Sequence, residues 1–251
     1  MMKNILEQSV LASAALCAAI LPAQAAGDTT VVLVHGAFAD GSSWGKVIPL
    51  LQAKGVKVVA VQNPLSSLAD DVSAARKAID AQPGKVVLVG HSWGGAVITQ
   101  AGDSDKIKAL VYVAAFAPSE GETLGAVGKD YPVSPGVSTL KPDAAGYLAL
   151  SEASYAANFA QDIPAASARA YAATQGLFPA RAFDETIGYA AWKSKPNYYI
   201  VAGNDRMISP DLQRAFARKL KAVTTVLGSS HVPMLSQPQK VADVILAAVQ
   251  R

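Results

Sequence analysis

Cysteine is nearly absent from the sequence, because the only one among 251 residues is Cys17, inside an apolar N-terminal stretch. The residue before it is Leu16, whereas a bacterial lipoprotein signal has a small residue at that place, so lipidation is not expected. Disulfides, thiolate metal sites and cysteine nucleophiles all require a thiol. Once the N-terminal stretch is removed, the sequence excludes all three, which suits an oxidising compartment.

Charged residues are also scarce, at 16% of the chain, and 22 basic residues face 19 acidic ones. No stretch concentrates the basic residues into a patch that could follow a phosphate backbone, so nucleic acid is not an expected partner. Hydrophobic residues make up 51% of the chain, which is enough for a large core and argues against disorder. The length fits a single domain.

The first 25 residues have the features of a secretory signal peptide. Lys3 supplies a positive charge, residues 9–21 (SVLASAALCAAIL) are apolar, and Ala23 and Ala25 form an A-x-A cleavage site around Gln24. The apolar stretch is shorter than the roughly 20 residues that cross a bilayer, so no stable membrane anchor is expected after cleavage. The sequence therefore predicts an exported protein, periplasmic or extracellular, with a single mature domain over residues 26–251.

Short apolar runs alternate with longer amphipathic stretches from Thr30 onward, which is typical of a buried parallel sheet with crossover helices. The expected strands are residues 30–35, 57–61, 85–90, 109–114, 198–202 and 223–227. The expected helices are residues 44–54, 68–81, 93–101, 211–220 and 238–250. This order predicts an α/β fold with a mostly parallel, doubly wound sheet of about six strands.

The interval of residues 118–195 interrupts this alternation, because it contains no expected strand and is too long for a plain crossover connection. We predict a helical cap there, inserted after the fourth strand and covering one end of the sheet. Several of its aromatic residues are expected to line an apolar pocket, and the others to pack the cap against the core. These aromatic residues are Tyr131, Tyr147, Tyr155, Phe159, Tyr171, Phe178, Phe183, Tyr189 and Trp192.

A serine in a G-x-S-x-G pattern is the strongest catalytic signal in the sequence. The segment VVLVGHSWGG places Ser92 between an expected strand and an expected helix, with Gly90 and Gly94 two residues to either side. A tight turn of this kind presents the serine above the edge of the sheet, and the glycines let the backbones pass without a clash. Ser92 is therefore predicted to be a nucleophile, the alternative being that it only caps the helix.

A base must take the proton of a nucleophilic serine, and the sequence has three histidines. His231 follows the last expected strand, at the sheet edge where Ser92 is expected, whereas His35 and His91 are expected to pack or to form hydrogen bonds. Asp205, after the fifth expected strand, is predicted to orient His231, with a turn-forming aspartate as the alternative. The order serine, aspartate, histidine is that of the α/β-hydrolases.

The negatively charged oxygen of a tetrahedral intermediate requires preorganised N–H donors. The backbone N–H of Trp93, directly after the serine, is one expected donor. The second is expected from Ala37, in the loop after the first strand, with Phe38 as the alternative. No cofactor or metal is expected, because GAFADGS lacks the lysine of a phosphate-binding loop and the histidines are dispersed.

Four segments, VLVHGAFADGSSW, VVLVGHSWGG, AGNDRMISP and SSHVPMLSQP, resemble the α/β-hydrolase superfamily. More narrowly, they resemble small bacterial serine hydrolases related to plant methylesterases and hydroxynitrile lyases. The resemblance implies a catalytic triad of Ser92, Asp205 and His231 and an oxyanion hole formed by the backbone N–H groups of Ala37 and Trp93. It covers essentially the whole mature chain, strongly in the core and weakly in the cap.

The chain departs from the hydroxynitrile lyases at two positions of this resemblance. Those lyases have a lysine after the triad histidine and a threonine in the oxyanion loop, where this chain has Val232 and Gly36. Because no cation would stabilise cyanide, we expect a carboxylesterase that cleaves small to medium apolar esters through an acyl-enzyme on Ser92. The alternatives are lyase or cofactor-free perhydrolase activity on the same triad, amide or lactone hydrolysis, and a non-catalytic binder of small ligands.

Overall fold

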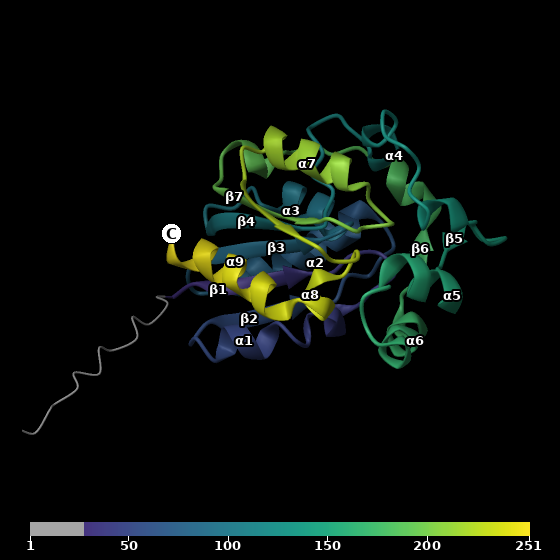
Figure 1. The fold of residues 1–251 in the computed structure, drawn as a ribbon. Coiled ribbons are helices and arrows are strands. Elements are labelled where there is room, and N and C mark those ends of the chain that lie inside the picture. Colours follow the sequence, from purple (N-terminus) through teal and green to yellow (C-terminus); the bar gives the residue numbers. More distant parts are fainter. Residues whose placement is uncertain (1–27) are drawn as a thin grey trace, which may run out of the picture.

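A computed structural model describes residues 28–251, so the predicted signal peptide, residues 1–25, lies outside the described residues. Six strands form one parallel sheet in the order β2-β1-β3-β4-β7-β8 (Figure 1). Their bounds are β1 (Thr30–Val34), β2 (Lys57–Val61), β3 (Val86–His91), β4 (Ile107–Val113), β7 (Asn197–Ala202) and β8 (Val223–Leu227). The predicted α/β fold with a parallel, doubly wound sheet of six strands is confirmed.

Helices cover both faces of this sheet. α1 and α9 pack against each other on one face, and α2 and α3 pack against each other on the opposite face (Figure 1). The helices outside the cap are α1 (Ile48–Gln52), α2 (Leu68–Asp80), α3 (Gly94–Ala101), α7 (Pro210–Lys219), α8 (Pro233–Ser236) and α9 (Pro238–Gln250). None of the helices in residues 28–251 has both the length and the apolar character that a membrane span requires.

The burial of the strands follows their position in the sheet. Every residue of the central strands β1 and β3 is buried, which explains their nearly continuous apolar sequences. The edge strands β2 and β8 are mostly half-buried or exposed. The helix expected over residues 44–54 is instead a 3₁₀ turn, Gly41–Trp44, followed by α1. Asp40 caps the 3₁₀ turn through the Ser42 N–H, and Pro49 favours a separate start for α1.

Short elements fill the segment between β4 and β7, and they cover one end of the sheet (Figure 1). They include α4 (Leu124–Val127), β5 (Tyr147–Leu148), α5 (Glu152–Ser154), a π-helical turn (Tyr155–Phe159), α6 (Ala165–Thr174) and β6 (Phe178–Pro179). The expectation that residues 118–195 contain no strand is wrong, because β5 and β6 form a small antiparallel pair. Each of these strands has two residues, which is too short to produce an alternating pattern.

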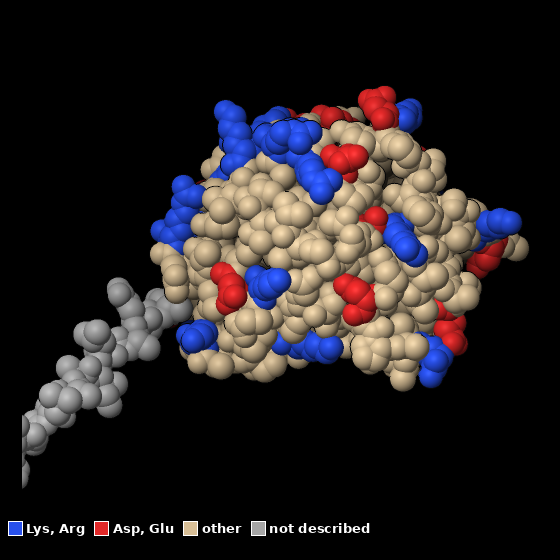
Figure 2. Space-filling model, in the orientation of Figure 1, with Lys and Arg blue, Asp and Glu red and all other residues tan. Residues whose placement is uncertain are grey.

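Charge is thinly distributed over the face that Figure 2 shows, in keeping with the low content of charged residues. Lysine and arginine side chains gather over α7, and most of the remaining surface in this view is uncharged. Arg218 and Lys219 lie in the last turn of α7, where positive charge is favourable beside the unpaired carbonyl groups of a helix end.

The turn from β3 into α3 depends on glycines because backbones approach each other closely there. A Cβ atom on Gly94 would lie 2.6 Å from the carbonyl oxygen of Val34, and one on Gly90 would lie 2.4 Å from that of Gly94. The first turn of α3 therefore packs directly on the end of β1. This contact fixes the position of residues 91–93, which lie between the two glycines.

Gly94→Ala should lower the free energy of unfolding by about 3 kcal/mol, because the added methyl group must push two backbone segments apart. Urea denaturation measures this change. Gly128→Ala is the matched control, since a Cβ atom there would meet only Leu212 Cδ2 at 3.8 Å. Equal unfolding midpoints for the two variants would contradict the close contact between α3 and β1.

Candidate active site

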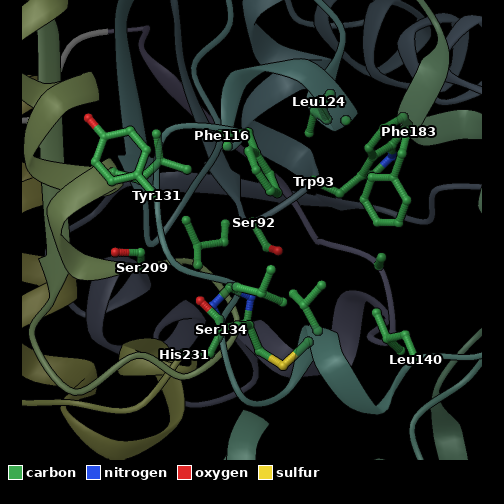
Figure 3. Close-up of a pocket in the computed structure, with 18 of the residues that line it drawn as sticks. Ser92, Trp93, Phe116, Leu124, Tyr131, Ser134, Leu140, Phe183, Ser209 and His231 are labelled. Carbon is green, nitrogen blue, oxygen red and sulfur yellow. The ribbon is translucent and has the colours of Figure 1, made fainter.

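Ser92 lies in the turn between β3 and α3, with a φ of 53°. A non-glycine residue in this left-handed region is strained, and such strain persists only where the surroundings impose it. The Ser92 N–H donates to the Val113 carbonyl at 3.2 Å, and its own carbonyl accepts from the N–H groups of Gly95 and Phe116 at 3.0 and 3.2 Å. These bonds hold the backbone, and the side chain lines a pocket under the cap (Figure 3).

His231 follows β8 and lines the same pocket as Ser92 (Figure 3). Its Nδ1 lies 2.7 Å from Asp205 Oδ2, so Nδ1 carries the proton and donates it to the carboxylate. The imidazole packs edge-on against the Phe159 ring, with centroids 4.9 Å apart, and is tilted on the His91 ring at 4.7 Å. The ring is thereby held in place, and its Nε2 forms no hydrogen bond within residues 28–251, so it is available to accept a proton.

The Asp205 carboxylate accepts four hydrogen bonds in a fully buried position. Besides the bond from His231, Oδ1 accepts from the N–H groups of Met207 and Ile208 at 2.7 and 3.1 Å, and Oδ2 accepts from Gln213 Nε2 at 2.7 Å. These donors stabilise a negative charge that would otherwise be costly to bury. Asp205 is thus fixed in position as the partner of His231.

Gln213, on α7, is a residue that the sequence reasoning missed. Its Oε1 accepts from the Ala202 N–H at 2.9 Å, and its Nε2 donates to the Ile208 carbonyl at 2.9 Å as well as to Asp205. A signal was available, because Gln213 stands three and four residues before the buried Phe216 and Ala217 and therefore shares their helix face. A glutamine on the buried face of a helix requires polar partners.

The loop after β1 lies directly against Ser92. A Cβ atom on Gly36 would come within 2.7 Å of Ser92 Cβ, so only glycine fits there. Ala37 and Trp93 both line the pocket, and neither backbone N–H donates a hydrogen bond to another atom of residues 28–251. The two N–H groups predicted for the oxyanion hole are therefore available to a ligand.

The other two histidines have structural hydrogen bonds. His35 Nε2 accepts from the Asn63 N–H at 2.9 Å, so its proton sits on Nδ1, which donates to the Gly36 carbonyl at 2.9 Å. His91 Nε2 donates to the His231 carbonyl at 2.8 Å. Burial lowers the pKa of His35 below its usual value, and burial lowers that of His91 much further. Both rings are therefore neutral near pH 7.

The pocket has a volume of about 440 Å³ and is largely apolar. Of the nine aromatic residues of the cap, only Tyr131 and Phe183 line the pocket within the described residues, which is fewer than expected. Tyr155, Phe159 and Phe178 are instead buried in the packing of the cap. Other lining residues are Phe38, Phe116, Leu124, Leu140, Met207, Ile208 and Leu212. Within residues 28–251, no group of three or more acidic, histidine or cysteine side chains could hold a metal ion.

The model of the alpha/beta hydrolase family matches residues 31–244. Methylesterase 2 of Arabidopsis thaliana is 29% identical, over 86% of this chain and 94% of its own. Salicylic acid-binding protein 2 of Nicotiana tabacum is 28% identical, over 86% of this chain and 95% of its own. The pyrethroid hydrolase of Sphingobium wenxiniae is 27% identical, over 86% of each chain.

Solved structures resemble the chain in fold. Polyneuridine aldehyde esterase superposes with a TM-score of 0.76 at 22% identity, covering 87% of this chain and 98% of its own. An extracellular alpha/beta-hydrolase from a Paenibacillus species gives a TM-score of 0.74 at 21% identity, covering 88% and 98%. The similarity spans the sheet and the segment between β4 and β7, since it covers nearly the whole described chain.

The free energy of unfolding should fall as the pH drops from 6.5 to 5. The unfolded chain binds protons at His35 and His91 in this range while the folded chain does not, which costs at most about 1.4 kcal/mol per pH unit for each histidine. Burial raises the pKa of Asp71 to about 6, and this carboxyl opposes part of the loss because the folded chain takes up its proton first. Urea denaturation across the range measures the balance.

The variant His91→Gln isolates one of these contributions, because the Gln amide can still donate to the His231 carbonyl and does not titrate. Its stability should decline less steeply over the same pH range. A stability that stays level or rises as the wild type is acidified would contradict the two buried neutral histidines.

Proposed function

Because the chain belongs to the alpha/beta hydrolase family, we propose that it is a serine-dependent hydrolase of carboxylic esters. The observation that carries this proposal is the pair of Ser92 and His231 in one apolar pocket, with His231 hydrogen-bonded to the buried Asp205. Nucleophile, base and orienting acid are the parts that acyl transfer requires. The relatives named as methylesterases and as a pyrethroid hydrolase support an ester as substrate.

In the proposed mechanism, the Ser92 hydroxyl attacks the ester carbonyl carbon while His231 Nε2 takes the hydroxyl proton. Asp205 holds the proton on Nδ1 and stabilises the resulting imidazolium. The N–H groups of Ala37 and Trp93 bind the oxyanion of the tetrahedral intermediate. Its collapse expels the alcohol, which receives the proton from His231, and leaves Ser92 acylated.

Water then completes the cycle by hydrolysing the acyl-enzyme. His231 Nε2 takes a proton from the water, whose oxygen attacks the acyl carbonyl, and a second tetrahedral intermediate forms in the same oxyanion hole. Collapse of this intermediate releases the carboxylic acid and returns the proton to the Ser92 oxygen.

The pocket favours an ester with an apolar group of small to medium size. Its volume of about 440 Å³ falls within the usual range for small-ligand sites, and its walls are mostly aliphatic and aromatic. Lys129 is the only lysine, arginine or carboxylate among its described lining residues, and it lies on the exposed rim. Hydrolysis is preferred over cyanohydrin cleavage, because buried, uncharged Val232 follows the base where the lyases have lysine.

Ser92→Ala tests the nucleophile with p-nitrophenyl acetate and butyrate as substrates. Removal of the attacking oxygen should lower kcat by on the order of 10⁶, and only the slow hydrolysis that proceeds without the serine nucleophile should remain. The matched control is Ser42→Ala, because Ser42 is exposed in the 3₁₀ turn before α1 and does not line the pocket. Equal hydrolysis by wild type and Ser92→Ala, or hydrolysis by neither, would contradict the esterase assignment.

We also propose that the protein is exported and that cleavage follows Ala25. The basis is the sequence of the first 25 residues, with Lys3, an apolar stretch and an A-x-A site. Expression of the full chain in a bacterial host, followed by fractionation and intact-mass measurement, should give a periplasmic or secreted product that begins at Ala26. A cytoplasmic product that retains the first 25 residues would contradict export.

A further inference from the structure

A buried carboxylate lies behind the pocket and contacts the residue that follows Ser92. Asp71, in the first turn of α2, has no exposed surface. Its Oδ2 accepts from the indole Nε1–H of Trp93 at 2.7 Å, and its Oδ1 accepts from the N–H of Leu65 at 2.8 Å. Leu65 has a φ of 56°, so this bond also holds a strained turn between β2 and α2. The steps proposed above give Asp71 no chemical role.

The cap rests on the same turn. Glu185 Oε2 accepts from the N–H of Leu68 at 2.7 Å, and Arg181 Nη2 donates to the carbonyl of Ser66 at 3.1 Å. Gly176 packs so closely on Leu65 that a Cβ atom there would lie 2.7 Å from Leu65 Cδ1. Residues 65–71 therefore contact the cap on one side and Trp93 on the other.

Trp93 has two roles that depend on its position. Its backbone N–H is a proposed oxyanion donor, one residue after Ser92. Its indole packs edge-on against Phe178, with centroids 4.9 Å apart, and against Phe183 at 6.4 Å. Phe183 and Trp93 both line the pocket (Figure 3). A shift of the indole would therefore move the pocket wall and the oxyanion donor together.

We propose that Asp71 is a positioning residue for ester hydrolysis, which fixes Trp93 so that its backbone N–H meets the oxyanion and its indole forms one wall of the pocket. This inference rests on the proposed function. A displacement of an oxyanion donor by a fraction of an ångström weakens a bond that forms only in the transition state. Loss of the positioning should therefore lower kcat more than it changes KM.

The position requires a carboxylate and not an amide. Both Asp71 oxygens face N–H donors, whereas an asparagine would turn its NH₂ group toward one of them. The pKa of Asp71 is raised to about 6, chiefly by burial and to a smaller extent by the nearby carboxylates of Asp70 and Glu185, which together outweigh the lowering by the two hydrogen bonds. Above this pH the carboxylate is charged, and its bond to the indole is strengthened by that charge.

Asp71→Asn tests the proposal with p-nitrophenyl butyrate at pH 8. We expect kcat to fall about tenfold or more while KM changes less than threefold. Asp70→Asn is the matched control, because it removes the same charge from the neighbouring position. The Asp70 carboxylate is exposed and, in the described part of the chain, accepts hydrogen bonds only from Ser66 and Ser67. Asp70→Asn should stay within twofold of the wild type. A twofold or smaller effect of Asp71→Asn would overturn the proposal.

A double-mutant cycle separates positioning from general stability. Trp93→Phe keeps an aromatic ring and removes the indole N–H, so Asp71→Asn should add less than a threefold loss of kcat in that background. If Asp71→Asn instead acts through the Leu65 turn, the double variant should show the product of the two single losses of kcat, and this result would overturn the proposal. If Asp71→Asn does not fold, the comparison of Trp93→Phe with the wild type tests the proposal. A tenfold loss of kcat in Trp93→Phe would support the positioning role of Asp71, and an unchanged kcat would overturn it.

Nuclear magnetic resonance of the indole N–H groups gives a readout independent of ester turnover. The resonance that disappears in Trp93→Phe should titrate in the wild type with a midpoint near 6, the pKa of Asp71, and should not titrate there in Asp71→Asn. A Trp93 indole resonance whose chemical shift does not change between pH 5 and 7 would overturn the proposed coupling between Asp71 and Trp93. An absence of ester hydrolysis by the wild type, with this titration intact, would contradict the proposed function and leave the contact between Asp71 and Trp93 established.

Discussion

Close backbone packing around the turn between β3 and α3 is the constraint on which the rest of the site depends. Gly36, Gly90 and Gly94 each occupy a place where a Cβ atom would fall within 2.7 Å of a neighbouring atom. Because these backbones touch, Ser92 is held in a left-handed conformation with its side chain facing the cap. The loop after β1 lies beside it, and the Ala37 N–H in this loop donates no hydrogen bond within residues 28–251. The nucleophile and the oxyanion hole that we propose would thus arise from one packing arrangement.

Two buried carboxylates extend this arrangement outward, and both oxygens of each accept hydrogen bonds from N–H donors. Asp205 accepts four bonds, from His231, Gln213 and two backbone N–H groups, and Asp71 accepts two. An unpaired buried carboxylate would destabilise the fold, so these groups tolerate few substitutions of either partner. The same hydrogen bonds that compensate the buried charges also fix the orientation of His231 and of Trp93. On both sides of the pocket, the bonds that stabilise the fold therefore also set the geometry of the site.

The sheet was predictable from the sequence because its central strands are buried on both faces and therefore consist of continuous apolar runs. The triad candidates were predictable because each follows a strand at the same edge of the sheet. The pair of β5 and β6 was not, since two residues carry no periodicity. The spacing of Gln213 from Phe216 and Ala217 placed it on the buried face of α7, a signal that the sequence reasoning did not use, whereas Asp71 resembled a solvated helix position and the packing of α2 shows that it faces inward. The cap aromatics Tyr155, Phe159 and Phe178 were indistinguishable from pocket residues because burial and pocket lining select the same side chains.

The cap contacts both residues of the proposed catalytic pair, Ser92 and His231, or their neighbours, which bears on how substrate preference and rate would relate in this molecule. On the side of the base, the Phe159 ring packs on His231, and Asp162 accepts a hydrogen bond at 2.7 Å from the N–H of Ser230. On the side of the nucleophile, Phe178 packs on Trp93. A substitution in the cap that reshapes the pocket is therefore also expected to disturb residues that orient the His231 imidazole or Trp93, the proposed oxyanion donor. For that reason, we expect that changes in the cap would rarely alter the proposed preference among esters without also altering the rate of the proposed hydrolysis.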